Sequence, residues 1–158
     1  MSNYIAPINF ENARILFRNF RGAESKYNRA GDRNFCVIID NPEDAKKLTD
    51  EGWNVKTLPA TDEYEDETYY IMVSVSFKYR APDVYLISNG NKTQLDEESI
   101  GQLDTADIAN ADLSIRPYTW SVNGKSGVKA YLNTLYVTLE EDPFAAKYSH
   151  VDQNNVPW

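Results

Sequence analysis

Residues 111–139, ADLSIRPYTWSVNGKSGVKAYLNTLYVTL, limit the folds open to this chain more than any other stretch. Two runs rich in β-branched and aromatic residues, which favour strands, flank residues 122–127, VNGKSG. Asn and Gly tolerate the positive φ angles that a tight hairpin turn requires. The stretch therefore predicts a long β-hairpin joined at residues 122–127.

The two faces of this hairpin differ in chemistry, because side chains alternate between faces along a strand. One face comprises Leu113, Ile115, Thr119, Val128, Ala130 and Leu132, and the other comprises Arg116, Tyr118, Trp120, Lys129, Tyr131 and Asn133. Aromatic rings that stack on unpaired bases, next to cations that contact phosphates, are typical of proteins that bind single-stranded nucleic acid. The alternative is a sheet whose second face is covered, with Tyr and Trp in a mixed core. The hairpin by itself favours neither interpretation.

A second cationic segment lies near the N-terminus. Residues 10–21 alternate like a strand, and residues 22–32 read as a loop. Residues 14–33 contain six cations and two anions, a net +4 in a chain of net charge −8. The candidate DNA contacts in this segment are Arg14, Arg18, Phe20, Arg21, Lys26, Tyr27, Arg29 and Arg33. The alternative is a solvated loop, but this loop continues a basic strand face, which favours the functional interpretation.

The other predicted elements complete a mainly β chain. They are a buried strand over 33–40 with Cys36 in the core, a helix at 42–51 capped by Asn41, a short strand over 53–58, a strand over 69–80, a second Asn-Gly hairpin over 84–95, and a short helix over 97–106. The strand over 69–80 ends in Lys78 and Arg80, two further candidate contacts, with Tyr79 on its apolar face. Residues 61–68 hold five acidic residues and are interpreted as a surface loop.

Composition excludes several kinds of site. A single Cys and a single His rule out a disulfide framework and a Cys-cluster zinc site, and they argue against a multi-His metal centre. We therefore expect no catalytic residues, no metal and no cofactor. Gly124-Lys125-Ser126-Gly127 superficially resembles a phosphate loop, but it joins two strands rather than a strand and a helix. No signal peptide or membrane span is visible, which predicts a cytoplasmic protein.

The pattern of short strands, Asn-Gly turns and a helix before the last hairpin predicts a small antiparallel barrel with inserts. A length of 158 residues suits one domain, expected over 1–148. Residues 149–158 are polar and without periodicity, and are expected to form a flexible tail.

The segments GDRNFCVIID, PEDAKKLTDEGWNVK and SIRPYTWSVNGKSGVKAYLNTLYVTLEED resemble those of phage-encoded single-stranded DNA-binding proteins with an oligonucleotide/oligosaccharide-binding (OB) fold. The resemblance covers roughly residues 10–145, and its most specific parts are the RPYxW…GKSGVKAYL hairpin and the DRNF strand entry. It implies an OB-fold-like, five-stranded antiparallel barrel that holds a single strand, without sequence specificity, during phage DNA replication or recombination in the host cytoplasm. The contact positions that it implies are Arg116, Tyr118, Trp120, Lys125, Lys129 and Tyr131, joined by the cations of residues 14–33.

The C-terminus is similar to a second family in its last residues. Bacterial single-stranded DNA-binding proteins end in an acidic tip closing on a Pro-aromatic pair that recruits partner enzymes, and this chain ends in Val156, Pro157 and Trp158. It departs from that pattern because only Asp152 stands in the acidic part. Recruitment of replication or recombination proteins by this tail is therefore only a hypothesis. The sequence leaves the oligomeric state open.

Two other functions compete with DNA binding. A carbohydrate- or protein-binding β module would also use Tyr and Trp platforms, but neutral sugars do not require the neighbouring cations. A nuclease using scattered carboxylates is a weaker alternative, because the chain has none of the spaced motifs of known catalytic sites.

Overall fold

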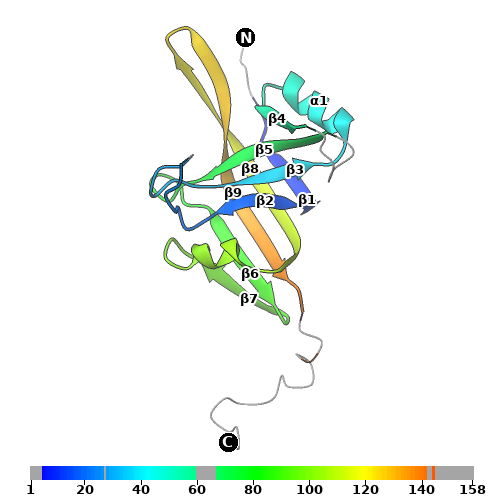
Figure 1. Ribbon diagram of the computed structural model, residues 1–158, viewed down its shortest axis with the longest axis vertical. Helices are drawn as coiled ribbons and strands as arrows, with labels where there is room; N and C mark the ends of the chain where they lie inside the picture. The colour runs from blue at the N-terminus through cyan, green and yellow to red at the C-terminus, as the bar shows by residue number, and fades with distance from the viewer. Residues whose placement is uncertain (1–4, 27, 60–66, 142–143, 145–158) are drawn as a thin grey trace, which may run out of the picture.

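The computed structural model describes residues 5–26, 28–59, 67–141 and 144 (Figure 1). In chain order the elements are β1 (Ile8–Ala13), β2 (Ile15–Asn19), β3 (Arg33–Ile39), α1 (Pro42–Asp50), β4 (Val55–Leu58), β5 (Thr68–Val75), β6 (Asp83–Ser88), β7 (Asn91–Leu95), a 3₁₀ helix η1 (Ile100–Asp104), β8 (Ile108–Val122) and β9 (Lys125–Leu139). No helix among these residues is long and apolar enough to cross a membrane. The acidic residues 61–66 and the predicted tail 149–158 lie outside the described residues.

Within the described part of the chain the strands form one nine-stranded sheet. Its main path runs β1-β8-β9-β5-β3-β2, with β4 paired to β5, β6 paired to β9, and β7 paired to β6. Strands β5 and β6 both pair with β9 in parallel, and the other pairs are antiparallel. The predicted closed, five-stranded antiparallel barrel is therefore wrong in strand number and direction, although the mainly β class is confirmed.

The two ends of this path are consecutive in the chain, since only Arg14 separates β1 from β2. No ladder joins β1 to β2 in the described sheet: β1 pairs with β8, and β2 pairs with β3. The sheet is thus open and curled, and its two edge strands, β1 and β2, are connected through Arg14 without pairing.

The long hairpin at the centre of the sheet is confirmed. Strands β8 and β9 are 15 residues each and pair along their length, from Ile108↔Leu139 to Val122↔Lys125. The turn residues Asn123 and Gly124 both have positive φ, at 52° and 79°, as this type of tight turn requires. Figure 1 shows the turn end of this hairpin extending beyond the rest of the sheet, opposite the end that carries β6 and β7.

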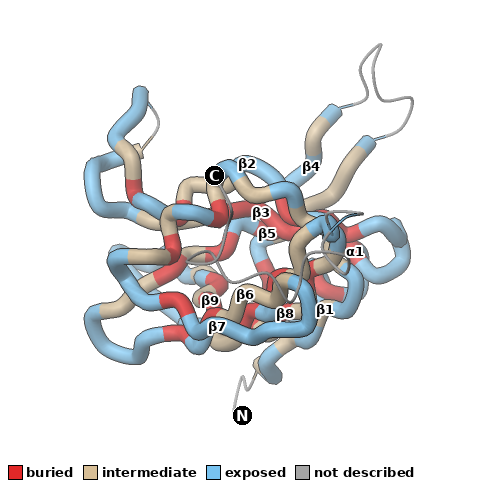
Figure 2. The backbone as a smooth tube through the Cα atoms, turned by 90° about the horizontal axis from the view of Figure 1, so that it is seen from below, coloured by how far each residue is buried: buried red, intermediate tan, exposed pale blue. Residues whose placement is uncertain are grey.

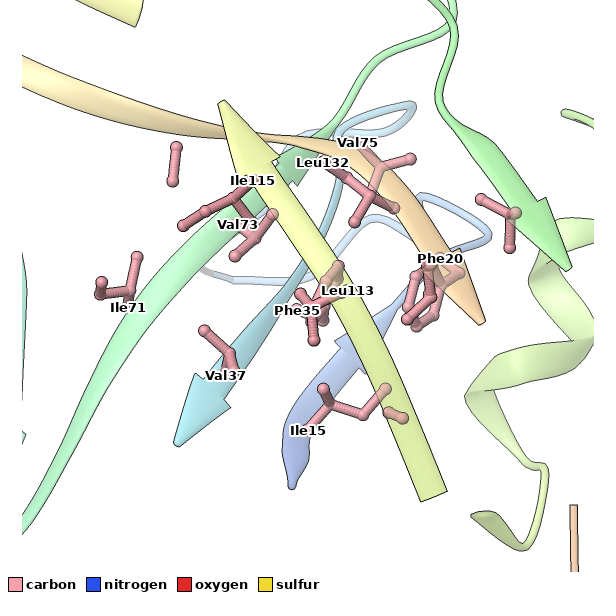
Figure 3. Close-up of a cluster of buried hydrophobic side chains, with 14 of the residues drawn as sticks. Ile15, Phe20, Phe35, Val37, Ile71, Val73, Val75, Leu113, Ile115 and Leu132 are labelled. Atoms are coloured by element: carbon pink, nitrogen blue, oxygen red, sulfur yellow. The ribbon is translucent and has the colours of Figure 1, made fainter. Parts of the chain in front are cut away.

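The core lies on the inner face of the curled sheet. Figure 2 shows the buried segments on the strands, with exposed loops around them. Figure 3 shows side chains from β2, β3, β5, β8 and β9 converging, among them Phe35, Val73 and Ile115. Cys36 is buried as predicted and packs as a small apolar side chain.

Both predicted helical segments are present. Helix α1 begins after Asn41, whose side-chain oxygen accepts a hydrogen bond from the Glu43 amide at 2.8 Å. It ends before Gly52, which has a φ of 107°. The second segment is a shorter, 3₁₀ helix, Ile100–Asp104, and its side chains Ile100 and Leu103 are buried.

Candidate nucleic-acid interface

The cations and aromatic rings of the β8–β9 hairpin come together on one face. The register pairs Arg116 with Tyr131, Tyr118 with Lys129, and Trp120 with Gly127. Directly paired residues of antiparallel strands point to the same side of a sheet. These five side chains, Arg116, Tyr118, Trp120, Lys129 and Tyr131, are called the hairpin face below.

Tyr131 is the centre of the hairpin face. The Arg116 guanidinium and the Lys129 ammonium group each lie 5.1 Å from the centre of the Tyr131 ring. The Tyr118 ring meets the same ring edge-on, with 6.0 Å between centroids and 89° between planes. Cations at this distance from an aromatic face are attracted by its quadrupole, so these contacts hold the positive charges beside the rings.

The rings of the hairpin face are at the surface. The exposed fraction is 54% for Tyr118 and 40% for Trp120, whereas Ile115, Ala130 and Leu132 on the opposite face are buried. The alternative of a mixed core under a covered second face is therefore wrong. Ile115, Ala130 and Leu132 belong to the core, whereas Tyr118 and Trp120 are displayed at the surface.

The hairpin face has no compensating negative charge among the described residues. The structure gives neither Arg116 nor Lys129 a carboxylate partner there. Arg116 Nη2 makes one long hydrogen bond, at 3.5 Å, to the Arg80 carbonyl oxygen, and its buried Nε has no acceptor. Two positive charges are thus available for an anion from outside, such as a phosphate.

Four arginines of the N-terminal segment, unlike the cations of the hairpin face, form ion pairs with carboxylates. The ion pairs are Arg14–Asp40 at 3.1 Å, Arg21–Asp104 at 3.8 Å, Arg29–Asp32 at 3.4 Å and Arg33–Glu97 at 3.4 Å. Asp32 is already counted in the local net charge of +4, whereas Asp40, Asp104 and Glu97 lie outside residues 14–33 and compensate part of that charge. Arg116 and Lys129 of the hairpin face, by contrast, have no ion pair with a described carboxylate.

Arg18 has a structural role. Its Nη1 donates to the carbonyl oxygens of Leu103 and Ala106, at 2.7 Å and 2.8 Å. These bonds tie β2 to the end of the 3₁₀ helix, and the guanidinium satisfies carbonyls that a helix end leaves without partners.

The prediction that Phe20 contacts DNA is wrong. Phe20 is completely buried, and its ring stacks on Phe35 with 5.0 Å between centroids. The alternation of β2 is broken because Phe17 has a φ of 52° and the pairing with β3 shifts between Leu16 and Asn19. Phe17 is consequently 61% exposed, although regular alternation over residues 10–21 would place it on the same face as Ile15, which is buried.

The remaining candidates are exposed, or lie outside the described residues. Lys26, Lys78, Arg80 and Lys125 are exposed, whereas Tyr27 and the tail residues Val156, Pro157 and Trp158 are not described. Lys125 begins β9 at the hairpin turn, and Arg80 is joined to the hairpin face through its carbonyl.

Several surface aromatic residues were missed by the sequence analysis. Strand β5 ends at Val75, so Tyr79 leaves the sheet and is 97% exposed, between Lys78 and Arg80. Its position between two cations was the available signal. Tyr85 and Tyr136 form a stacked pair, with 4.9 Å between centroids, across a parallel pairing that the sequence does not reveal.

The described residues hold no group of three or more His, Cys, Asp or Glu side chains that could bind a metal ion. The chemistry available at the hairpin face is stacking, cation–π contact and ion pairing.

The family model of the phage ssDNA-binding domain matches residues 2–157, nearly the whole chain. The chain belongs to this family. The predicted resemblance to phage-encoded single-stranded DNA-binding proteins is confirmed. Members of the family are binding proteins without enzymatic activity, in agreement with the predicted absence of catalysis.

Solved structures support the same assignment at the level of the fold. The single-stranded DNA-binding protein from bacteriophage Enc34 has a TM-score of 0.58 at 15% sequence identity, over 94% of this chain and 88% of that chain. The same phage protein in complex with ssDNA has a TM-score of 0.59 at 16% identity, over 87% of this chain and 89% of that chain. No curated protein sequence matches the chain.

Proposed function

We propose that this phage ssDNA-binding domain coats single-stranded DNA through the hairpin face, without strong sequence preference. Bases stack on Tyr118, Trp120 and Tyr131, and phosphates contact Arg116 and Lys129, with Lys125 at the turn. One observation carries the proposal. Arg116 and Lys129 each lie 5.1 Å from the centre of the Tyr131 ring, and neither cation has a carboxylate partner among the described residues. Stacking of a base on such a ring contributes about 1–3 kcal/mol.

Further contacts extend this interface. Lys78 and Arg80 lie in the loop that follows β5, and the Arg80 carbonyl oxygen accepts a hydrogen bond from Arg116. The bound DNA strand would therefore continue from the hairpin face onto this loop. The N-terminal cations Arg14, Arg21, Arg29 and Arg33 would contribute less, because a phosphate would have to displace the carboxylate that each one already contacts. Lys26 and Tyr27 stay in the proposal as contacts of the same loop.

The biological setting is also part of the proposal. The protein would shelter single strands during phage DNA replication or recombination in the host cytoplasm, as one domain over residues 1–148. The residues 149–158 would form a tail that recruits other replication proteins through Val156, Pro157 and Trp158. Because β1 and β2 are one bent segment at the two ends of the sheet, we regard the fold as an opened variant of the OB barrel.

A carbohydrate-binding module is the second candidate for an exposed Tyr and Trp surface. Arg116 and Lys129 make this function less suitable, because neither cation has a carboxylate partner among the described residues. A neutral sugar has no anionic group to compensate their charges, whereas a phosphate does.

The test is a fluorescence anisotropy titration with labelled oligo-dT, oligo-U and a duplex of the same length. We expect oligo-dT to bind more tightly than the duplex, with an affinity that falls with salt at a slope of about −0.7 per phosphate neutralised. Chelation of metal ions should leave the affinity unchanged. Equal or tighter binding of the duplex would contradict the proposal.

A further inference from the structure

A small recess borders the hairpin face at the point along β5 where the pairing with β4 ends and the pairing with β9 begins. It has a volume of about 150 Å³ and is lined by Asn54, Ile71, Met72, Ser74, Trp120, Val128, Lys129 and Ala130. Strands β4 and β9 occupy successive stretches of the same strand β5, with Val55 paired to Ile71 and Ala130 paired to Val73. The recess lies at the junction between them.

The lining of this recess combines apolar and polar residues. Ile71 and Ala130 are buried residues of the sheet, whereas Met72 and Trp120 are exposed. Asn54, Ser74 and Lys129 are the polar residues of the lining. An apolar site with a few polar groups that fix orientation is the usual composition of a small-ligand site.

We propose that this recess takes a single nucleobase of the bound DNA strand and reads its hydrogen-bonding edge. The proposal rests on the proposed function, because the occupant is inferred from continuity with the hairpin face. Trp120 and Lys129 belong to both, so a base stacked on Trp120 would have its backbone phosphate close to Lys129. A flat ring with a polar edge matches a recess whose lining combines aliphatic, aromatic and polar residues.

The side chain of Asn54 is the one most suited to reading the base. An amide offers both a donor and an acceptor, and Asn54 precedes β4 as an exposed residue with no hydrogen bond from its side chain to other described residues. Ser74 lies opposite Tyr131 in the parallel register and adds a hydroxyl next to the central ring of the hairpin face. A base held this way would give a several-fold bias at one position of a strand that is otherwise bound through stacking and phosphates.

A chemical probe separates edge reading from stacking. N3-methyl-thymine keeps the ring that stacks but loses the N–H at the pairing edge. Labelled oligo-dT and oligo-(N3-methyl-dT) of equal length are titrated against the full chain and against Asn54→Ala, Ser74→Leu and Ser76→Leu. Ser74→Leu fills the recess, and Ser76→Leu is the matched control, since Ser76 lies two residues further along and does not line it.

We expect the native chain to bind oligo-dT about three- to tenfold more tightly than the methylated strand, a difference of about 0.7–1.4 kcal/mol. Asn54→Ala and Ser74→Leu should remove this difference, and Ser76→Leu should keep it. Equal affinity of the native chain for oligo-dT and the methylated strand, or an affinity difference that survives in both recess variants, would contradict base reading by the recess. Either result would leave the proposed function unaffected. Absence of binding to any single strand would instead overturn the proposed function, and the recess with it.

Discussion

The indole ring of Trp120 lies against Gly127 of the facing strand, so closely that a Cβ atom on Gly127 would come within 2.8 Å of its Cζ2 atom. Such a distance is too short for a real contact, and the ring would have to move. The two residues are direct partners in the β8–β9 register. Gly127 therefore fixes where the proposed stacking platform lies, because it leaves room for the ring beside the backbone.

Replacing Gly127 by Ala should weaken single-strand binding while leaving the fold intact. The added methyl group displaces the Trp120 ring. One stacking platform contributes about 1–3 kcal/mol, so the binding free energy should weaken by about 1 kcal/mol or more. The measurement is an oligo-dT titration, with Ser126→Ala as the control at a neighbouring exposed position. Unchanged affinity in Gly127→Ala would show that the position of this ring does not matter for binding.

Removing a cation of the hairpin face should change the salt dependence of binding. Lys129→Ala should lower affinity for all single strands and reduce the salt slope by about 0.7, the value for one phosphate contact. Arg29→Ala is the matched control, because Arg29 already contacts Asp32 at 3.4 Å. Titrations at several salt concentrations provide the slopes. An equal change of the salt slope in both variants would show that the N-terminal loop contacts phosphates as much as the hairpin face does.

Phe20→Ala should destabilise the fold and leave binding by the folded fraction unchanged. Loss of a completely buried ring stacked on Phe35 should lower the free energy of unfolding by about 3–5 kcal/mol. Phe17→Ala, at a 61% exposed position three residues earlier in the chain, should cost far less. Urea denaturation of the two variants makes the comparison. A stable Phe20→Ala protein with weakened DNA binding would restore Phe20 to the interface.

The local features of this fold could be predicted from the sequence. The Asn123-Gly124 turn and the alternation on either side of it are short-range signals, and the resulting hairpin places Arg116, Tyr118 and Trp120 on one face as expected. Helix α1 was predicted for the same reason, since its cap Asn41 is adjacent to it in sequence.

Long-range pairings could not be predicted in the same way. The partner of Arg14 is 26 residues away and that of Arg33 is 64 residues away, so the segment appeared to carry a free positive charge that the folded chain compensates. The parallel pairings of β9 with β5 and β6 are likewise set by tertiary packing. The irregular backbone of β2 at Phe17, finally, reversed the side on which Phe20 lies.

The Cys36 thiol should make stability depend on pH in alkaline solution. Burial raises the pKa of this thiol from 9.0 to about 11, against a smaller opposing effect of Lys56. A raised pKa means that the native state holds the proton more tightly than the unfolded state. This contribution to stability is therefore complete below pH 9 and is lost as the pH rises toward 11.

Urea denaturation of the native chain and of Cys36→Ala on both sides of this pH range tests the effect. The native chain should lose more free energy of unfolding than the variant, because Tyr and Lys titrate in both proteins and cancel in the comparison. Identical pH profiles would show that the thiol does not titrate differently in the folded and unfolded states.

The most direct test of the central claim is Trp120→Ala, with DNA affinity and stability measured on the same protein. Trp120 is 40% exposed and lies on the hairpin face, so its removal should weaken oligo-dT binding by about 1–3 kcal/mol and barely change the free energy of unfolding. A core Trp would instead cost about 3–5 kcal/mol of folding stability. A stability loss of that size, with unchanged affinity in the folded fraction, would contradict a DNA-binding role for the hairpin face.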